Sequence, residues 1–255
     1  MAEPLLASRH ALVTGGGRGI GRAVAAALRG AGAAVTVVGR TEAELAEAVS
    51  SRDADGYVVA DVTDARALSD GLARAAAQRG AIDILVANAG GVETVPFAKS
   101  EPDLFRRMFE LNVMGVVHAV RAVLGDMTAR RSGRIVAVAS IAGLKGYAYV
   151  SAYCAAKHAV VGLVRALAIE TAQTGVTVNA VCPGYTDTAM VRDGVARIGA
   201  KTGRAHEEIL ANMIEQNPMG RLITPEEVAA AVLYLCSPQA AAITGTTLPV
   251  AGGEL

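Results

Sequence analysis

The sequence predicts a single α/β domain built on a doubly wound parallel sheet of about seven strands, with helices on both faces. Two observations lead to this fold class. Short apolar runs rich in β-branched residues recur along the chain, and longer Ala- and Leu-rich segments with helical spacing separate them. Runs such as IVAVA and VTVNAV do not alternate polar with apolar residues, which is typical of parallel strands buried on both faces.

Seven segments are predicted as strands: Ala11 to Thr14, Val35 to Val38, Tyr57 to Val59, Ile84 to Ala87, Arg134 to Ala139, Val176 to Val181 and Thr246 to Val250. Parallel strands need long crossover connections, so the Ala-rich segments between them are expected to be helices. Two helix starts carry boundary signals. The run TPEE at 224–227 combines a cap, a first-turn proline and two acids, and Thr41 with Glu44 fits a capping box.

Composition favours one folded domain over residues 1–255. Hydrophobic residues make up 52% of the chain and charged residues 19%, which is enough apolar surface for a sizeable core. No Pro/Ser-rich linker or repeat divides the chain. The segment 186–220 has weaker strand patterning, several glycines and helically spaced Met and Ile, and it is expected to form a small lid.

Charge and cysteine content exclude several other classes of protein. The 24 basic and 24 acidic residues give a net charge of +0, so no basic field is available for nucleic acid. The three cysteines, Cys154, Cys182 and Cys236, are far apart and predict neither a disulfide framework nor a metal site. With no secretory signal and no uninterrupted apolar stretch of about 18 residues, we expect a cytoplasmic protein without a membrane span.

A glycine-rich segment, TGGGRGIG at 14–21, lies between the first predicted strand and the first predicted helix. Glycines let the backbone turn sharply and approach a pyrophosphate, and the following helix presents free N–H groups and the positive end of its dipole. In a βαβ unit this arrangement predicts a dinucleotide site. The expected contacts come from Gly15, Gly17, Arg18, Gly19, Ile20 and Gly21.

The end of the second strand indicates which dinucleotide binds. An acidic residue about 20 positions beyond the glycines would bind the ribose hydroxyls of NAD, whereas a basic one accommodates the phosphate of NADP. The strand ends at Val38-Gly39-Arg40, and Arg18 in the loop can assist Arg40. We therefore predict NADP. Glu42 keeps NAD as the less favoured alternative, although its place in the first turn of a helix also explains it.

A phenol and an amine, Tyr153 and Lys157, lie four residues apart in a segment with helical periodicity, so both are expected on one helix face. At about 4 Å and an effective dielectric of about 20, an ammonium would stabilise the phenolate by roughly 4 kcal/mol, or about three pKa units. This predicts that Tyr153 transfers protons near neutral pH. Ser140 ends the strand IVAVAS and is expected at the ligand-binding edge, hydrogen-bonded to the substrate oxygen.

The Gly-x-x-x-Gly-x-Gly spacing, Asn112, Ser140 and the Tyr153 and Lys157 pair resemble the classical branch of the short-chain dehydrogenase/reductase family, over nearly the whole chain. The resemblance implies a Rossmann-type fold and a catalytic set of these four residues. In it, Asn112 holds a water that links the lysine to solvent. The further cofactor contacts it implies are Asp61, Val62, Asn88, Ala89, Gly90, Tyr153, Lys157, Pro183, Gly184, Thr186 and Thr188. Taken alone, Asp61 is also a plausible helix cap.

The activity that the resemblance implies is NADP(H)-dependent reduction of a ketone to a secondary alcohol, and the reverse. The C-terminal half, with TGVTVNAVCPG and NPMGRLITPEEVAAAVLYL, looks like that of 3-oxoacyl thioester and polyketide ketoreductases. A 3-oxoacyl thioester or a hydrophobic cyclic or aryl ketone is therefore the expected substrate. An apolar pocket is expected from Val92, Leu144, Tyr147, Tyr149, Tyr185 and Met190.

The sequence also bears on the partners of the protein. The resemblance implies a homo-oligomer, typically a tetramer. Arg130 and Arg131 are candidates for docking an acyl carrier protein, but Thr174 stands where carrier reductases often have a basic residue, so a free or coenzyme A-linked substrate competes. The alternative function is an NAD(P)-binding sensor or scaffold without turnover. Such a protein would keep the glycine loop but would not need Ser140, Tyr153 and Lys157 together.

Overall fold

Seven parallel strands form one sheet in the order β3-β2-β1-β4-β5-β6-β7 in the computed structural model, which describes residues 3–254. The strands are β1 (His10–Thr14), β2 (Ala34–Gly39), β3 (Gly56–Val59), β4 (Ile84–Ala87), β5 (Gly133–Val138), β6 (Val176–Pro183) and β7 (Thr247–Val250). The predicted fold class is thus confirmed, with strand ends shifted by at most two residues. Strands β1 to β3 extend the sheet to one side, and β4 to β7 extend it to the other. The strand order therefore reverses between β1 and β4, and ligands bind at such a switch point.

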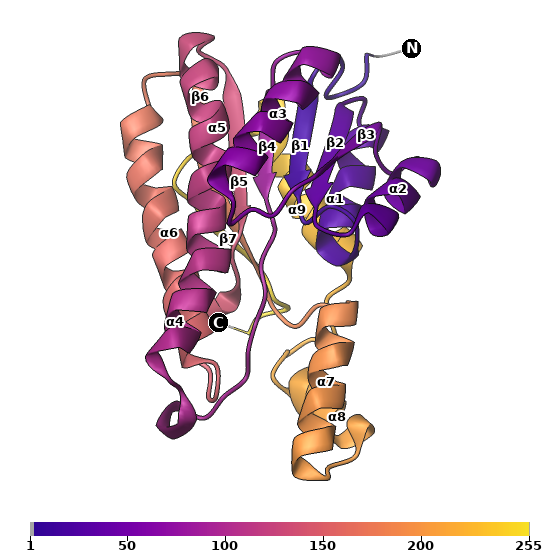
Figure 1. Cartoon of the computed structure of the whole chain (residues 1–255), viewed down its shortest axis with the longest axis vertical. Coiled ribbons are helices and arrows are strands. Elements are labelled where there is room, and N and C mark those ends of the chain that lie inside the picture. The colour runs from indigo at the N-terminus through magenta and orange to yellow at the C-terminus, as the bar shows by residue number, and fades with distance from the viewer. Residues whose placement is uncertain (1–2, 255) are drawn as a thin grey trace.

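Helices cover both faces of the sheet (Figure 1). One face carries α1 (Gly19–Gly30), α2 (Glu42–Ser50) and α9 (Pro225–Cys236), and the other carries α3 (Ala65–Arg79), α5 (Gly115–Ala129) and α6 (Ser151–Thr171). Alternate residues of β1 show how the two cores form. Leu12 packs into the cluster under α3, α5 and α6, whereas Val13 packs into the cluster under α1 and α9, and both are fully buried. This two-sided burial explains why the strands lack a polar alternation.

The two predicted capping boxes have different outcomes. At the start of α9, the Thr224 hydroxyl accepts from the Glu227 amide at 3.3 Å, and the Glu227 carboxylate accepts from the Thr224 amide at 2.8 Å, so this box is confirmed. The box at Thr41 is wrong. Thr41 makes no side-chain cap, and Glu44 lies 3.7 Å from Arg18 of the glycine loop, a charge attraction that the local sequence pattern did not reveal.

Two helices, α7 (Ala189–Thr202) and α8 (His206–Glu215), project beyond the carboxyl edge of the sheet (Figure 1). They fall within the segment that we expect to be a lid. Val195 is the buried residue of α7 and Ile209 that of α8, so little of this pair is packed into a core. Sparse burial of this kind is typical of segments that open locally.

By length and composition, two helical segments could cross a membrane: the continuous helix Pro102–Ala129, which includes α4 (Pro102–Phe109) and α5, and the helix Ser151–Thr171. Our sequence criterion missed them because charged residues interrupt their apolar runs. In the structure α5 and α6 pack against the sheet, with 39% and 44% of the most apolar windows of the two segments buried. Core helices of soluble proteins meet the same criterion, so this is weak evidence for a membrane.

Candidate active site

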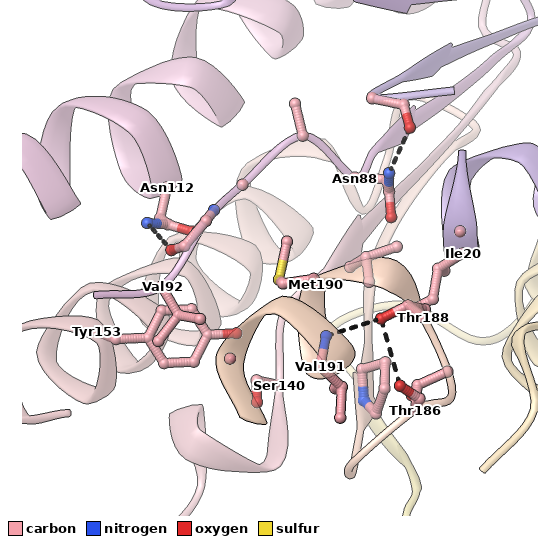
Figure 2. A pocket seen from close by; sticks show the side chains of 18 of the residues that line it. Ile20, Asn88, Val92, Asn112, Ser140, Tyr153, Thr186, Thr188, Met190 and Val191 are labelled. Atoms are coloured by element: carbon pink, nitrogen blue, oxygen red, sulfur yellow. Dashed lines mark hydrogen bonds between the residues drawn. The ribbon is translucent and has the colours of Figure 1, made fainter. Parts of the chain in front are cut away.

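A cavity of about 510 Å³ lies at the carboxyl ends of the strands and reaches from the glycine loop to α7 and α8. Its volume is within the range of small-molecule sites. All four predicted catalytic residues line it: Asn112 between α4 and α5, Ser140 after β5, and Tyr153 and Lys157 on α6. Figure 2 shows several of the lining side chains around the pocket. The predicted cofactor residues line it too, except Gly21, and so do the predicted pocket residues, except Leu144.

The two exceptions have clear physical reasons. A Cβ on Gly21 would lie 2.2 Å from the Gly15 carbonyl oxygen and 2.5 Å from the Asn88 amide nitrogen, so Gly21 allows α1 to pack closely against the loop. Leu144 packs against the buried cluster under α6 and does not face the cavity. In this structure Gly21 serves close packing and Leu144 packs against the core. A cofactor contact at Gly21 and a substrate contact at Leu144 stay predictions.

The glycine loop has the features that a bound pyrophosphate requires. Gly15 and Gly19 have φ angles of +64° and +53°, a left-handed conformation that favours glycine. Helix α1 begins at Gly19 without a side-chain cap and without an acidic residue in its first turn. Its N-terminal N–H groups are therefore available to an anion, and the residues present fit a dinucleotide.

Hydrogen bonds fasten this loop to the end of β4. The Asn88 side chain donates to the carbonyl oxygens of Thr14 and Gly15 at 3.0 and 3.1 Å. In return, the Thr14 hydroxyl accepts from the backbone amides of Asn88 and Ala89 at 3.0 and 3.1 Å. Sequence reasoning did not assign Thr14 to the site. Its position as the last residue of the first strand was the signal that could have revealed it.

Asn112 lies in a π-helical turn, Glu110–Met114, between α4 and α5. Its amide group donates to the carbonyl oxygens of Gly91 and Met108, both at 3.0 Å, and its oxygen accepts from the Gly91 amide at 3.2 Å. Figure 2 shows this side chain beside the loop that follows β4. A Cβ on Gly90 would lie 2.7 Å from the Asn112 oxygen, so the loop passes this side chain closely because residue 90 is glycine. Such π turns often occur at functional sites.

Tyr153 and Lys157 do project from one face of α6, as their spacing predicts. The Lys157 ammonium nitrogen lies 5.6 Å from the centre of the Tyr153 ring and donates to the Val138 carbonyl oxygen at 3.0 Å. Lys157 is only 5% exposed. Ser140, directly beyond β5, lies on the same side of the pocket as Tyr153 (Figure 2). A hydroxyl, a phenol and an amine thus lie together in the lining of one cavity.

Comparison with known proteins agrees with this geometry. Residues 9–198 match the family model described as short chain dehydrogenase. The chain belongs to this family. An acetoacetyl-CoA reductase of Rhizobium meliloti (strain 1021) is 41% identical over 248 residues, covering 97% of this chain and 98% of the relative. A cis-4-hydroxycyclohexanecarboxylate dehydrogenase of Sinomonas cyclohexanicum is 40% identical over 251 residues, with 97% and 96% covered.

Among solved structures, a single-site variant of actinorhodin polyketide ketoreductase with NADPH superposes with a TM-score of 0.92. It is 36% identical, and the match covers 96% of this chain and 97% of that one. The protein is therefore a short-chain dehydrogenase, an oxidoreductase that acts on CH–OH groups, and its family binds NAD(P).

The electrostatics of this short-chain dehydrogenase differ from the simple prediction. We expected Lys157 to lower the pKa of Tyr153 by about three units. Instead, burial raises the pKa of Tyr153 to about 12, against an opposing effect of the Ser140 hydroxyl, and burial lowers the pKa of Lys157 to about 8. The helix spacing was right, but desolvation is the largest influence on the pKa of each group.

Two arginines lie at the dinucleotide end of the cavity, each near a carboxylate. Arg40 is 3.7 Å from Asp61, and Arg18 is 3.7 Å from Glu44; their side chains are 73% and 61% exposed. Burial disfavours ionised Asp61, yet hydrogen bonds from Thr63 and the nearby Arg40 lower its pKa overall.

Asp61 does not cap α3. That role falls to Asp64, which accepts from the amides of Arg66 and Ala67.

Glu42, which kept NAD open in the sequence analysis, points elsewhere. Its carboxylate accepts a hydrogen bond from the Tyr57 hydroxyl at 2.9 Å, and it does not line the cavity. Glu44, two residues further along α2, is the acidic residue of this helix that lines the cavity. The specific reason for expecting NAD from Glu42 is thus removed.

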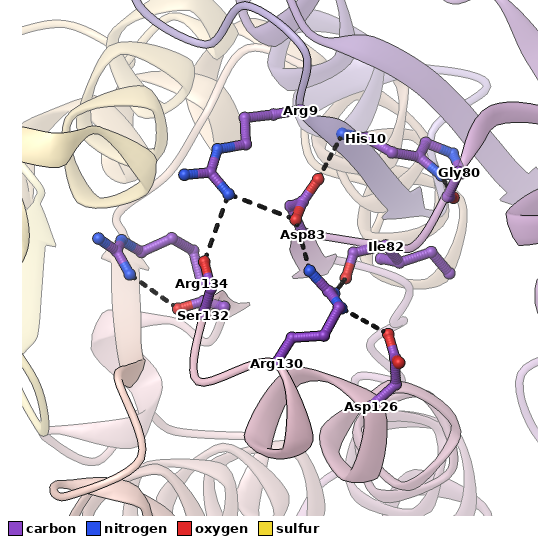
Figure 3. Close-up of polar contacts among 10 residues, drawn as sticks. Arg9, His10, Gly80, Ile82, Asp83, Asp126, Arg130, Ser132 and Arg134 are labelled. Carbon is purple, nitrogen blue, oxygen red and sulfur yellow. Dashed lines mark hydrogen bonds and ion pairs between the residues drawn. The ribbon is translucent and has the colours of Figure 1, made fainter.

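The candidate carrier-docking arginines, Arg130 and Arg131, form intramolecular contacts, and Figure 3 shows those of Arg130. Arg130 pairs with Asp83 at 2.8 Å and with Asp126 at 2.9 Å, next to the N-terminal ends of β1 and β4. Arg131 donates to the Gln173 carbonyl oxygen at 2.8 Å. This edge of the sheet is opposite to the cavity, so the two arginines of this chain do not flank its own site.

Proposed function

We propose that this short-chain dehydrogenase is an NADP(H)-dependent reductase of a hydrophobic cyclic or aryl ketone or a 3-oxoacyl thioester. The observation that carries the proposal is the convergence of Asn112, Ser140, Tyr153 and Lys157 on one cavity. When bound, the dinucleotide would supply the hydride. Tyr153 would protonate the substrate oxygen, and Ser140 would hydrogen-bond that oxygen as charge develops on it.

Residues beyond β6 would hold the nicotinamide end. Thr186 donates its hydroxyl hydrogen to the Gly184 carbonyl oxygen at 3.0 Å, and Thr188 caps α7. Figure 2 shows Thr186 and Thr188 at the edge of the pocket, where the Thr188 hydroxyl donates to the Thr186 carbonyl oxygen at 3.3 Å. Lys157 would bind the nicotinamide ribose and exchange protons with Tyr153. Asn112 would hold the water that links Lys157 to solvent.

The pKa directions favour the reducing direction at neutral pH. Reduction needs a protonated phenol, and the raised pKa of Tyr153, about 12, keeps it protonated. An alkoxide is the stronger base, so the proton transfer to it is downhill. Lys157, with a pKa of about 8, can then replace the proton on Tyr153 while it remains an ammonium.

We therefore expect the kcat for ketone reduction to be constant below about pH 7 and to fall as the pH rises through about 8. The sign follows from Lys157, which loses its proton above its lowered pKa of about 8 and can no longer supply it. Steady-state kinetics from pH 6 to 10 with saturating NADPH measure this profile, with NADPH affinity at each pH as the control. A kcat that is unchanged up to pH 9.5 would contradict it.

The substrate end of the cavity supports an apolar substrate that carries an anionic group. Val92, Tyr147, Tyr149, Tyr185 and Met190 line it, together with one charged side chain from the lid helices, Arg197. The neighbouring Arg192 pairs with Asp187 at 3.3 Å, but Arg197 forms no ion pair with any residue in 3–254. A carboxylate or the phosphates of coenzyme A would complement this cation. The relatives named above act on a coenzyme A thioester and on a hydroxycyclohexanecarboxylate.

A spectrophotometric screen tests the proposal. Oxidation of NADPH is followed at saturating cofactor with acetoacetyl-CoA, 4-oxocyclohexanecarboxylate, a neutral cyclic ketone and an aryl ketone. Turnover of any of them supports the reductase. NADPH binding with no turnover over the panel and in the alcohol direction would favour the sensor or scaffold. Preference for the two anionic substrates would support the role of Arg197.

The preference for NADP is proposed from Arg40, because no other basic side chain except Arg18 lines the adenosine end of the cavity within residues 3–254. Replacing Arg40 by Ala is expected to raise the KM for NADPH about tenfold and to change the KM for NADH less than twofold, since a charged hydrogen bond is worth about 1.5–3 kcal/mol. Arg66→Ala, on an exposed face of α3, is the matched control. Equal losses with both cofactors would contradict the assignment.

We also propose a homotetramer in the cytoplasm. The apolar windows in the α4–α5 segment and in α6 are less than half buried in the single chain, and Ile169 on α6 is 80% exposed. Association through these helices would cover such surface. Light scattering at micromolar concentration is expected to give about four times the 25.9 kDa mass of the chain. A monomer would contradict the proposal.

A further inference from the structure

A carboxylate is buried directly behind the substrate end of the cavity. Glu254 has a side chain that is 2% exposed, and it accepts a short hydrogen bond from the Tyr147 hydroxyl. The Lys145 ammonium lies 3.4 Å from the same carboxylate oxygen and donates to the Glu254 carbonyl oxygen at 2.7 Å. The second carboxylate oxygen, Oε2, is buried and has no hydrogen-bond partner within residues 3–254.

Burial of a carboxylate is unfavourable unless charges and donors compensate it. Here Lys145 supplies the opposite charge and Tyr147 supplies the donor, and the Lys145 ammonium also lies 5.1 Å from the centre of the Tyr147 ring. Burial and the hydrogen bond to Glu254 raise the pKa of Tyr147, so its hydroxyl stays a donor over the working pH range. The three side chains therefore hold one another in a single arrangement.

This arrangement forms the back of the aromatic wall of the cavity. Tyr147 and Tyr185 both line the cavity and pack edge to face, with ring centres 6.2 Å apart and an interplanar angle of 83°. Glu254 itself does not line the cavity. It also lies behind the backbone that leads to Tyr185, because a Cβ on Gly184 would be 3.3 Å from the unpartnered Oε2.

We propose that Glu254 is a positioning residue that determines substrate selectivity by fixing the orientation of Tyr147, and through it Tyr185. The inference rests on the proposed ketone reduction, since it concerns the pocket in which the ketone would bind. Tyr147 and Tyr185 would contact the substrate, whereas the Glu254 carboxylate lies behind them and would not. Loss of the carboxylate frees the Tyr147 hydroxyl and lets the ring rotate, so a tightly fitting ketone loses its contacts while a small one does not.

The experiment compares 2-tetralone, a bulky bicyclic ketone, with ethyl acetoacetate in wild type, Glu254→Gln and Tyr147→Phe. For each variant we expect kcat/KM for 2-tetralone to fall about tenfold, mainly through KM. In Glu254→Gln, whose side chain does not line the cavity, kcat/KM for ethyl acetoacetate should change less than threefold. The Kd of NADPH should stay within twofold. Glu226→Gln, on the exposed start of α9, is the matched control and should behave as wild type.

The double variant Tyr147→Phe/Glu254→Gln separates positioning from a general structural effect. If Glu254 acts through the Tyr147 hydroxyl, the double variant loses no more selectivity than Tyr147→Phe alone, because the hydroxyl that Glu254 holds is already absent. Additive losses, or an unchanged ratio of the two kcat/KM values in Glu254→Gln, would overturn the proposal. Tyr147→Phe also keeps the proposal testable should Glu254→Gln fail to fold.

Failure of the proposed function would look different. If wild type reduces neither ketone, nor any other in the panel, the proposed ketone reduction itself is refuted. The ratio of kcat/KM for 2-tetralone to that for ethyl acetoacetate cannot then be measured. If wild type reduces both and the ratio does not respond to Glu254→Gln, ketone reduction stands and only the role of Glu254 is refuted.

Discussion

Tyr153→Phe is expected to lower kcat for ketone reduction by at least about 100-fold. The phenylalanine ring keeps the packing of α6 but has no proton to give, and positioned proton transfer contributes about 10² to 10⁴-fold. NADPH affinity should change less than threefold, because the glycine loop, Arg40 and the residues after β6 are untouched. Single-turnover kinetics and NADPH fluorescence titration measure the two quantities.

Tyr234→Phe is the control for this substitution, since Tyr234 lies on α9 and is 47% exposed. It should leave both quantities unchanged. Turnover within about tenfold of wild type in Tyr153→Phe would remove the tyrosine from the reaction. Lost turnover together with lost NADPH affinity would instead indicate damage to the fold of the site.

Gly21→Ala is expected to destabilise the protein and to weaken NADPH binding, although Gly21 does not line the cavity. The new Cβ would lie 2.2 Å from the Gly15 carbonyl oxygen, which belongs to backbone that cannot yield as a flexible side chain would. Overpacking typically costs about 1–3 kcal/mol, and for a chain of this size each kcal/mol lowers Tm by about 2–4 °C. We therefore expect a Tm about 2–12 °C below wild type.

Displacement of Gly15 would move the amides that face the dinucleotide, so the Kd of NADPH should rise about tenfold or more. Gly30→Ala is the matched control at the other end of α1, where a Cβ meets nothing within 4 Å. Alanine is the better helix former, and this variant should be as stable as wild type or up to about 1 kcal/mol more stable. Equal Tm values for the two variants, measured by calorimetry, would contradict the packing role of Gly21.

Local patterns were enough to predict most of the fold. All seven strands were found because apolar, β-branched runs such as 134–139 are buried on both faces whatever surrounds them. The capping box at Thr224 was readable because its partners are three residues apart. The box at Thr41 failed for the opposite reason: Glu44 faces Arg18, a residue 26 positions away, and spacing along the chain carries no information on that contact.

The same distinction between local patterns and long-range contacts applies to the candidate site. The sequence alone was sufficient to place Tyr153 and Lys157 on one helix face and to locate the glycine loop, because helix periodicity and backbone sterics are local. Only the tertiary structure decided that burial raises the pKa of Tyr153, that Leu144 turns into the core, that Thr14 fastens the loop, and that Glu254 stands behind Tyr147. Desolvation and long-range contacts depend on which distant segments meet, and they exist only once the sheet and its helices have packed together.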